Sequence, residues 1–226
     1  MLIWAKKSEI DVEVINPIAK MYRERLNTEN LMDKLKAWEL SIIFRQMKRH
    51  FGDKKDISIL DFGAGASPFG AYLNHVGYQF VTCLDIKRGW HREINEESYN
   101  KRYNAHVQYF KTNIILNYTG YHDVIFSASV LEHLKSNKRI DFMQVLARHL
   151  SPGGLFIHVV DYKEVNGTPV NLRNLKKLVD NCGIPISYKL EQTPGCQPFN
   201  EAPKSTWWVM HRCTTRMTRV AFFNEK

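Results

Sequence analysis

Residues 57–76 read ISILDFGAGASPFGAYLNHV. This stretch begins with a short β-branched apolar run that ends at Asp61, passes through a turn with two glycines, and reaches Ser67-Pro68. Serine is a favoured helix N-cap and proline fits the first helical position, so the pattern predicts a strand, a tight turn and a helix. Such a turn brings backbone N–H groups close to a ligand at the start of a helix. The stretch therefore predicts a binding site for a nucleotide-like ligand.

The composition is that of a folded globular protein. The chain has 226 residues, enough for one domain with a sizeable core, and its hydrophobic and charged fractions are 44% and 24%. No run approaches the roughly 20 apolar residues of a membrane span. The apolar Leu2–Trp4 is too short for the core of a signal peptide and is soon followed by Lys6-Lys7. We therefore expect a cytoplasmic protein with no membrane span.

The cysteines are spaced too widely to suggest a metal centre. No CxxC pair occurs among Cys83, Cys182, Cys196 and Cys213. In a cytoplasmic protein, isolated cysteines of this kind are buried or idle thiols more often than disulfides or zinc ligands. We expect no metal.

The net charge of +9 raises the question of a nucleic-acid partner. The excess is spread along the chain, with +3 in residues 1–56, +2 in residues 57–150 and +4 in residues 151–226. One local cluster surrounds Trp207-Trp208 and His211, and its cations are Lys204, Arg212, Arg216 and Arg219. A solvated basic face explains this distribution most simply, and an anionic substrate or nucleic acid is the alternative.

Two helices are predicted ahead of the glycine turn. Asn16-Pro17 combines an N-cap residue with a proline, so a short helix is expected over residues 18–26. Apolar residues at helical spacing from Leu31 onward, a basic last turn and then Gly52 predict a longer helix. We expect residues 1–56 to form a helical extension that packs over the mouth of the ligand site, and residues 57–226 to form the main domain.

Strands and helices alternate after the turn. Further strands are predicted at residues 79–84, 107–110, 124–126, 155–160, 184–190 and 218–223. Helices are predicted from Asn95, from about Ile140 and from Thr168-Pro169, with a turn at residues 151–154. Continuous apolar strands that alternate with amphipathic helices predict an α/β, doubly wound, mostly parallel sheet.

The residues at the strand ends favour a cofactor without phosphates. Asp85 ends the second strand 24 residues after Asp61, where an acid that binds an adenosine ribose is expected. A dinucleotide fingerprint needs a third glycine, and Pro68 stands in its place. Asp61 would repel a pyrophosphate but attract an ammonium. These features favour S-adenosylmethionine over a nicotinamide dinucleotide.

Four segments together resemble the class I S-adenosylmethionine-dependent methyltransferases. They are ILDFGAGASPFGAYL, VTCLDI, DVIFSASVLEHL and LARHLSPGGLFIHVV, and the similarity covers roughly residues 57–160. The resemblance implies a transferase with a seven-stranded Rossmann-like sheet whose last strand is antiparallel. The SVLEHL form is similar to the branch that methylates small molecules, including quinone precursors and sugars.

The resemblance also implies site residues by position. Asp61, Gly63, Ala64 and Gly65 would hold the methionine end of the cofactor, Asp85 the ribose hydroxyls, Ile86 and Asn113 the adenine, and the Ala128 backbone the methionine moiety. Asn113 departs from the acid that the family often has there, although an amide can accept the same hydrogen bond.

A general base is expected just after the fourth strand. His133 is the leading candidate because the unperturbed pKa of histidine is near neutrality, and Glu132 stands beside it. The alternative is that both residues only cap or orient the next helix. His158, Asp161 and Tyr162 lie at the end of the fifth strand, where they either face the acceptor or are ordinary strand-end residues.

Missing motifs narrow the acceptor. No NPPY or DPPY sequence follows the fourth strand, and no Pro-Cys nucleophile occurs. Together with the dispersed charge, this favours a hydroxyl or amine of a small molecule or saccharide over RNA. The remaining alternative is a non-catalytic partner subunit with a nucleotide-binding fold. The sequence does not address the oligomeric state.

Overall fold

The computed structural model describes residues 2–4, 12–26, 31–86, 93–111, 118–163 and 217–225. The helix predicted from Thr168, the strand predicted at residues 184–190 and the cluster around Trp207-Trp208 lie outside these residues. Within the described part of the chain, no helix combines the length and apolarity that a membrane crossing requires.

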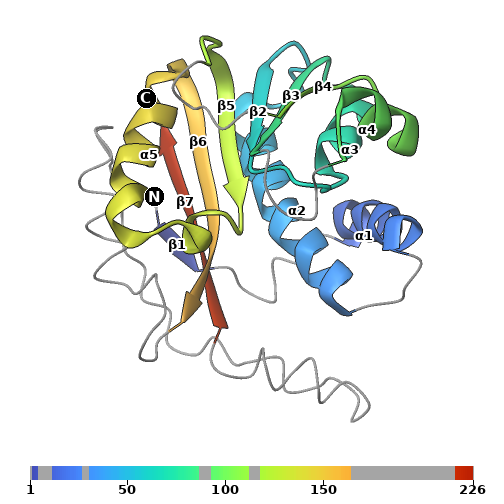
Figure 1. Ribbon diagram of the computed structural model, residues 1–226, viewed down its shortest axis with the longest axis horizontal. Coiled ribbons are helices and arrows are strands. Elements are labelled where there is room, and N and C mark those ends of the chain that lie inside the picture. The colour runs from blue at the N-terminus through green and yellow to red at the C-terminus, as the bar shows by residue number, and fades with distance from the viewer. Residues whose placement is uncertain are drawn as a thin grey trace.

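A single sheet organises the molecule (Figure 1). Its strands are β1 (Leu2–Trp4), β2 (Ser58–Phe62), β3 (Phe80–Asp85), β4 (Gln108–Lys111), β5 (His122–Ala128), β6 (Leu150–Lys163) and β7 (Met217–Glu225), in the order β1-β7-β6-β5-β2-β3-β4. The five strands β4, β3, β2, β5 and β6 pair in parallel. Their carboxyl ends therefore share one edge, which we call the carboxyl edge.

The α/β, mostly parallel sheet is confirmed, and its last strand is antiparallel as expected. β7 pairs antiparallel with β6 and, on its other side, with β1. The sequence did not predict a strand at Leu2–Trp4, which is too short to show a period. This segment forms the outermost strand of the described sheet because β7 offers it a free edge.

The turn predicted at residues 151–154 is wrong, because these residues lie within β6. His122 pairs with Leu150, whereas Val124 pairs with Leu155, so β6 carries extra residues in a bulge. Gly153 accommodates the bulge with a φ of 75°. Pairing continues on both sides, which turns a Pro-Gly-Gly turn signal into an irregular strand.

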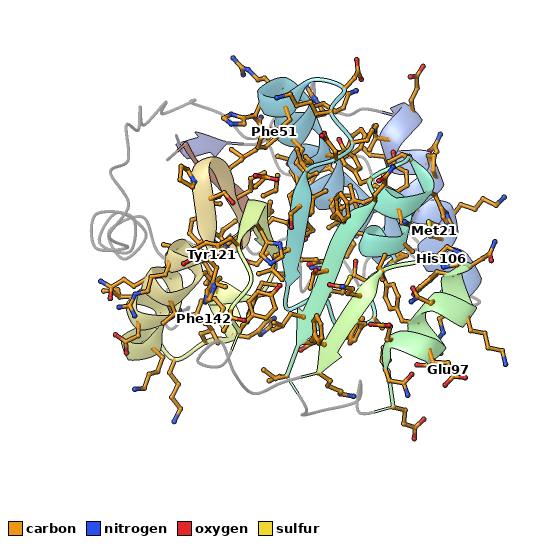
Figure 2. The ribbon with its side chains drawn as sticks, turned by 90° about the horizontal axis from the view of Figure 1, so that it is seen from above. Met21, Phe51, Glu97, His106, Tyr121 and Phe142 are labelled. Atoms are coloured by element: carbon orange, nitrogen blue, oxygen red, sulfur yellow. The ribbon has the colours of Figure 1, made fainter. Side chains whose placement is uncertain are left out.

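Helices cover both faces of the sheet (Figure 1). One core packs helices α1 (Val12–Leu26), α2 (Leu31–Phe51), α3 (Phe69–His75) and α4 (Glu96–Tyr103) against alternate strand residues such as Val124, Phe126 and Ile157. Helix α5 (Ser136–Arg148) covers the opposite face, where the rings of Phe142 and Phe62 meet edge to face at 4.6 Å (Figure 2). This doubly covered sheet is the predicted architecture.

The first helix starts earlier than predicted. α1 begins at Val12, and Pro17 lies inside it rather than at its first position. Val14, Ile15 and Ile18 are all buried, so the apolar face extends to both sides of the proline. Burial of that face outweighs the one backbone hydrogen bond that Pro17 cannot donate.

The longer helix and the helix from Asn95 form as predicted. α2 ends before Gly52, which adopts a φ of 63° and donates its N–H to the Lys48 carbonyl at 2.9 Å. Asn95 and Ser98 form a reciprocal capping box at the start of α4.

Candidate active site

The glycine turn between β2 and α3 has a conformation that depends on glycine. Gly63 and Gly65 adopt φ values of 73° and 53°, in the left-handed region. The N–H groups of Gly63 and Ala64 both donate to the Leu84 carbonyl, at 2.8 and 3.2 Å. A Cβ atom at Gly63 would lie 2.4 Å from Cγ2 of Val130, which follows β5. The turn is thus fixed between β3 and the segment after β5.

Asp61 is the penultimate residue of β2, and its buried carboxyl group has unused hydrogen-bonding capacity. Its side chain is 4% exposed, and its Oδ2 atom has no hydrogen-bond partner within the described residues. Burial raises the pKa of Asp61 well above its usual value, and the neighbouring Asp85 carboxylate raises it further. A cationic group beside Asp61 would relieve both effects, and an anionic phosphate would worsen them.

Asp85 ends the adjacent strand and is half-buried. Its Oδ1 atom accepts the N–H of Ile86 at 2.5 Å. Ile86 is 46% exposed, which is a high fraction for a large apolar side chain at the carboxyl edge. A carboxylate and an apolar surface side by side suit a ribose and its aromatic base. Asn113 lies outside the described residues.

The helix after the turn starts one residue later than predicted. Pro68, and not Ser67, occupies the N-cap position of α3. The Ser67 hydroxyl still accepts the N–H of Phe69, at 3.2 Å. Pro68 precedes the first helical residue rather than being that residue, because its φ of −75° and ψ of 1° are those of a turn.

Gly70 allows helix α3 to pack closely on the sheet. The dinucleotide fingerprint has its third glycine for this purpose two positions earlier, where this chain has Pro68. A Cβ atom at Gly70 would lie 2.4 Å from Cys83 Sγ on β3. The absence of a side chain at Gly70 therefore allows helix α3 to pack directly against β3. The signal was present two positions after Pro68. Cys83 itself is a buried free thiol, as predicted, and burial raises its pKa well above its usual value.

The end of β5 is tied to helix α2 by side chains that the sequence did not reveal. Ser129 adopts a φ of 54°, which is uncommon for a residue other than glycine, and its N–H donates to the Val159 carbonyl at 2.8 Å. The Ser129 hydroxyl donates to Glu39 Oε2 at 3.0 Å and accepts from Lys36 Nζ at 2.5 Å. Glu39 is fully buried. Backbone strain of this kind often marks a functional site.

The candidate bases occupy two different environments. His133 is exposed on the short helix η2 (Leu131–His133), directly after β5. The side chain of Glu132, the other residue predicted here, lies outside the described part of the structure. His158 is fully buried in β6, with its Nδ1 2.6 Å from the Ser127 hydroxyl. Burial lowers the pKa of His158 to about 3, which makes it a weak base. His133 is thus the better-placed candidate.

A cavity of about 690 Å³ lies away from this edge, between α1, α3 and α4. It is lined at the last turn of α3 by Tyr72, His75 and Val76, and on α1 by residues that include Met21 (Figure 2). The glycine turn is at the opposite end of α3, so this cavity is not the predicted cofactor site. No cluster of potential metal ligands occurs among the described residues.

The geometry fits the cofactor that the sequence favours. S-adenosylmethionine carries an ammonium and no phosphate, and the unpartnered buried Oδ2 of Asp61 calls for a cation. The second carboxylate and the exposed Ile86 lie on the next strand. Ala128, the last residue of β5, is paired with Val159 of β6 and half-buried at the same edge.

Comparisons with known proteins also indicate a methyltransferase domain. The profile of a methyltransferase domain family matches residues 36–210. The ubiquinone biosynthesis O-methyltransferase of Rickettsia bellii (strain OSU 85-389) is 25% identical over 149 residues, which is 65% of this chain. The chain spans 60% of the length of that relative.

Solved structures share the fold. A structure of a proposed sarcosine dimethylglycine methyltransferase from Galdieria sulphuraria gives a TM-score of 0.64 at 13% identity, over 93% of this chain and 98% of that chain. Magnesium protoporphyrin IX methyltransferase from Synechocystis PCC 6803 with bound SAH (S-adenosylhomocysteine) gives 0.55 at 13% identity, over 78% and 90%. At these identities the likeness concerns the fold alone. The family profile covers well over half of the chain, so the chain belongs to the methyltransferase domain family.

Proposed function

We propose that this enzyme transfers the methyl group of S-adenosylmethionine to a hydroxyl, or an amine, of a small molecule or saccharide. The observation that carries the proposal is the contact of Lys36 and Glu39 with Ser129. It fixes helix α2 against the end of β5, where in this proposal the acceptor approaches the cofactor. A helix at this position favours a small acceptor over a nucleic-acid duplex.

The cofactor is held, in this proposal, by the residues at the carboxyl edge. Asp61 binds its ammonium, Asp85 its ribose hydroxyls and Ile86 its adenine, while Gly63, Ala64 and Gly65 allow the backbone to approach it closely. The backbone of Ala128 faces the methionine moiety, and Asn113 is assigned to the adenine amine. The unpartnered Oδ2 of Asp61 and the exposed Ile86 support these assignments.

When bound, the cofactor supplies a methyl group on a positively charged sulfur. The residues of the chain orient the acceptor in line with that group and exclude water, and this positioning supplies much of the rate. His133 accepts the proton of an acceptor hydroxyl, with Glu132 beside it. The buried His158 contributes by holding Ser127 in place rather than by taking a proton.

Residues 1–56 form, in this proposal, an extension over the site. The contact of α2 with Ser129 supports a covering role. The family match begins at residue 36, inside α2, which favours treating residues 36–51 of that helix as part of the catalytic unit.

The ubiquinone-pathway relative supports a hydroxyl acceptor, because its name describes an O-methyltransferase. The test is transfer from methyl-labelled S-adenosylmethionine to separate pools of phenols, saccharides, amines and RNA. Label in a small-molecule pool that disappears in Asp85→Ala and falls at least tenfold in His133→Ala supports the proposal. Label in RNA alone would overturn it, as would transfer that is unchanged in Asp85→Ala.

A further inference from the structure

Three buried tyrosines donate hydrogen bonds to the glycine turn between β2 and α3. Their hydroxyls donate to three consecutive carbonyls, with Tyr109 bonded to Gly65 at 2.6 Å, Tyr103 to Ala66 at 2.9 Å and Tyr99 to Ser67 at 2.6 Å. Tyr99 and Tyr103 come from helix α4 and Tyr109 from strand β4. We call these three residues the tyrosine clamp.

The clamp fixes the orientation of the peptide planes in the turn. In a trans peptide the N–H points opposite to the carbonyl, and no peptide bond of the described chain is cis. The Gly65 and Ala66 carbonyls, held toward α4 and β4, therefore turn the N–H groups of Ala66 and Ser67 away from these elements, whereas Pro68, after the third carbonyl, has no N–H. Tyr99 also accepts the N–H of Ala71 at 3.3 Å, which links the turn to the first residues of α3.

The clamp is rigid because its rings pack on one another. Tyr99 lies 4.9 Å from Tyr103 and 5.2 Å from Tyr109, between ring centroids. The three side chains are between 1% and 8% exposed. Rings in mutual contact have few alternative rotamers, so each hydroxyl is held in place before any ligand arrives.

We propose that the tyrosine clamp is a positioning device that sets the affinity of the enzyme for its cofactor. Gly63 and Gly65 allow the turn many conformations, and the clamp selects one of them. Without the clamp hydroxyls, the turn would have to be ordered at the moment of binding, and that cost would weaken the complex. This inference rests on the proposed placement of the cofactor against the turn.

The test compares single hydroxyl deletions in the full chain. Tyr103→Phe and Tyr109→Phe are each expected to weaken S-adenosylhomocysteine binding in calorimetry by about three- to tenfold. Amide hydrogen exchange in residues 63–67 is expected to rise in both variants. Tyr99→Phe is the less clean variant, because that hydroxyl also accepts the N–H of Ala71.

Two controls separate positioning from stability. Tyr78 is fully buried, and its hydroxyl has no hydrogen-bond partner among the described residues, so Tyr78→Phe should leave affinity unchanged. Leu146→Ala should lower the Tm through a cavity under α5 without changing affinity. If folded Tyr103→Phe and Tyr109→Phe bound S-adenosylhomocysteine with wild-type affinity, the proposed role of the tyrosine clamp would be wrong. A wild-type protein that binds no S-adenosylhomocysteine would instead reject the proposed cofactor site.

Discussion

At the scale of single residues, the buried position of Asp61 lowers the stability of the fold and, in the proposed function, provides the binding site for the cofactor ammonium. A carboxylic acid whose pKa is raised in the folded state holds a proton that the unfolded chain has already lost. The free energy of unfolding therefore falls as the pH rises from about 4 through the raised pKa. At neutral pH the native state is therefore less stable than it would be with a carboxyl group of ordinary pKa at this position.

Asp61→Asn is therefore expected to be at least as stable as the wild type at pH 7, because it removes a buried carboxyl group whose ionisation the fold disfavours. We expect the variant to bind S-adenosylmethionine about 10- to 100-fold more weakly, since a charge-assisted hydrogen bond is lost. Calorimetry measures the affinity, and urea denaturation measures the stability.

The matched control for this prediction is Asp123→Asn. The Asp123 carboxylate accepts the N–H of Ser58 at the amino end of β2, far along the strand from Asp61. This control should lose stability and keep its affinity for the cofactor. A variant of Asp61 that binds as tightly as the wild type would contradict the assignment.

At the scale of elements, the contact between α3 and β3 depends on Gly70. The added methyl group of Gly70→Ala would meet Cys83 Sγ at 2.4 Å. We expect this overpacking to lower the free energy of unfolding by about 1–3 kcal/mol. Cys83→Ala makes room for the methyl group, so the double variant should recover part of the loss. Urea denaturation of the two single variants and the double variant checks this, and purely additive losses would argue against the contact.

The junction of α2 with β5 permits a second test at this scale. Ser129→Ala and Ser129→Gly remove the same hydroxyl, but glycine also relieves the left-handed φ of 54°. Ser129→Gly should therefore be more stable than Ser129→Ala by about 1 kcal/mol. Both should slow methyl transfer more than they weaken cofactor binding, because they release α2. Equal stabilities of the two variants would show that the backbone there is not strained.

The sequence predicted the elements whose signals are local. Helix α2 has an apolar period and a glycine stop, and α4 has its capping box within four residues. The start of α1 was missed because burial overrode Pro17, and the β6 bulge was missed because pairing overrode a turn signal.

The candidate site was predictable only in part, for the same physical reason. Asp61 and Asp85 follow apolar strands, so their neighbouring positions follow from the parallel pairing of β2 and β3. The contact of Lys36 with Ser129 joins residues 93 apart, and the clamp joins residues 32 to 44 apart. No local period encodes such contacts, because they arise only when the sheet assembles.

At the scale of the whole molecule, two buried histidines should make the fold sensitive to acid. Burial lowers the pKa of His122 to about 4 and that of His158 to about 3. His122 lies between the hydroxyls of Ser58 and Tyr118, at 2.8 and 2.6 Å. Below about pH 6.5 the unfolded chain binds protons that the native state refuses, so stability falls as the pH falls.

We expect His122→Gln to reduce the slope of unfolding free energy against pH by about 1 kcal/mol per pH unit between pH 4 and 6. The raised pKa of Asp61 acts in the opposite direction, so the comparison has to be made variant against wild type. Urea denaturation at pH 4, 5, 6 and 7 measures the slope. An unchanged slope would mean that His122 titrates alike in the folded and unfolded chain.

The tyrosine clamp responds to pH in a different way from these histidines. Burial raises the pKa of Tyr99 and of Tyr109, so both hydroxyls keep their protons far into the alkaline range. Phenols and alcohols become better nucleophiles as they lose a proton, which favours alkaline conditions for methyl transfer. Because the Tyr99 and Tyr109 hydroxyls stay protonated, they continue to donate to the turn under those conditions. Candidate acceptors can therefore be assayed at high pH, where weakly acidic hydroxyls react. The affinity for the cofactor should be kept under these conditions.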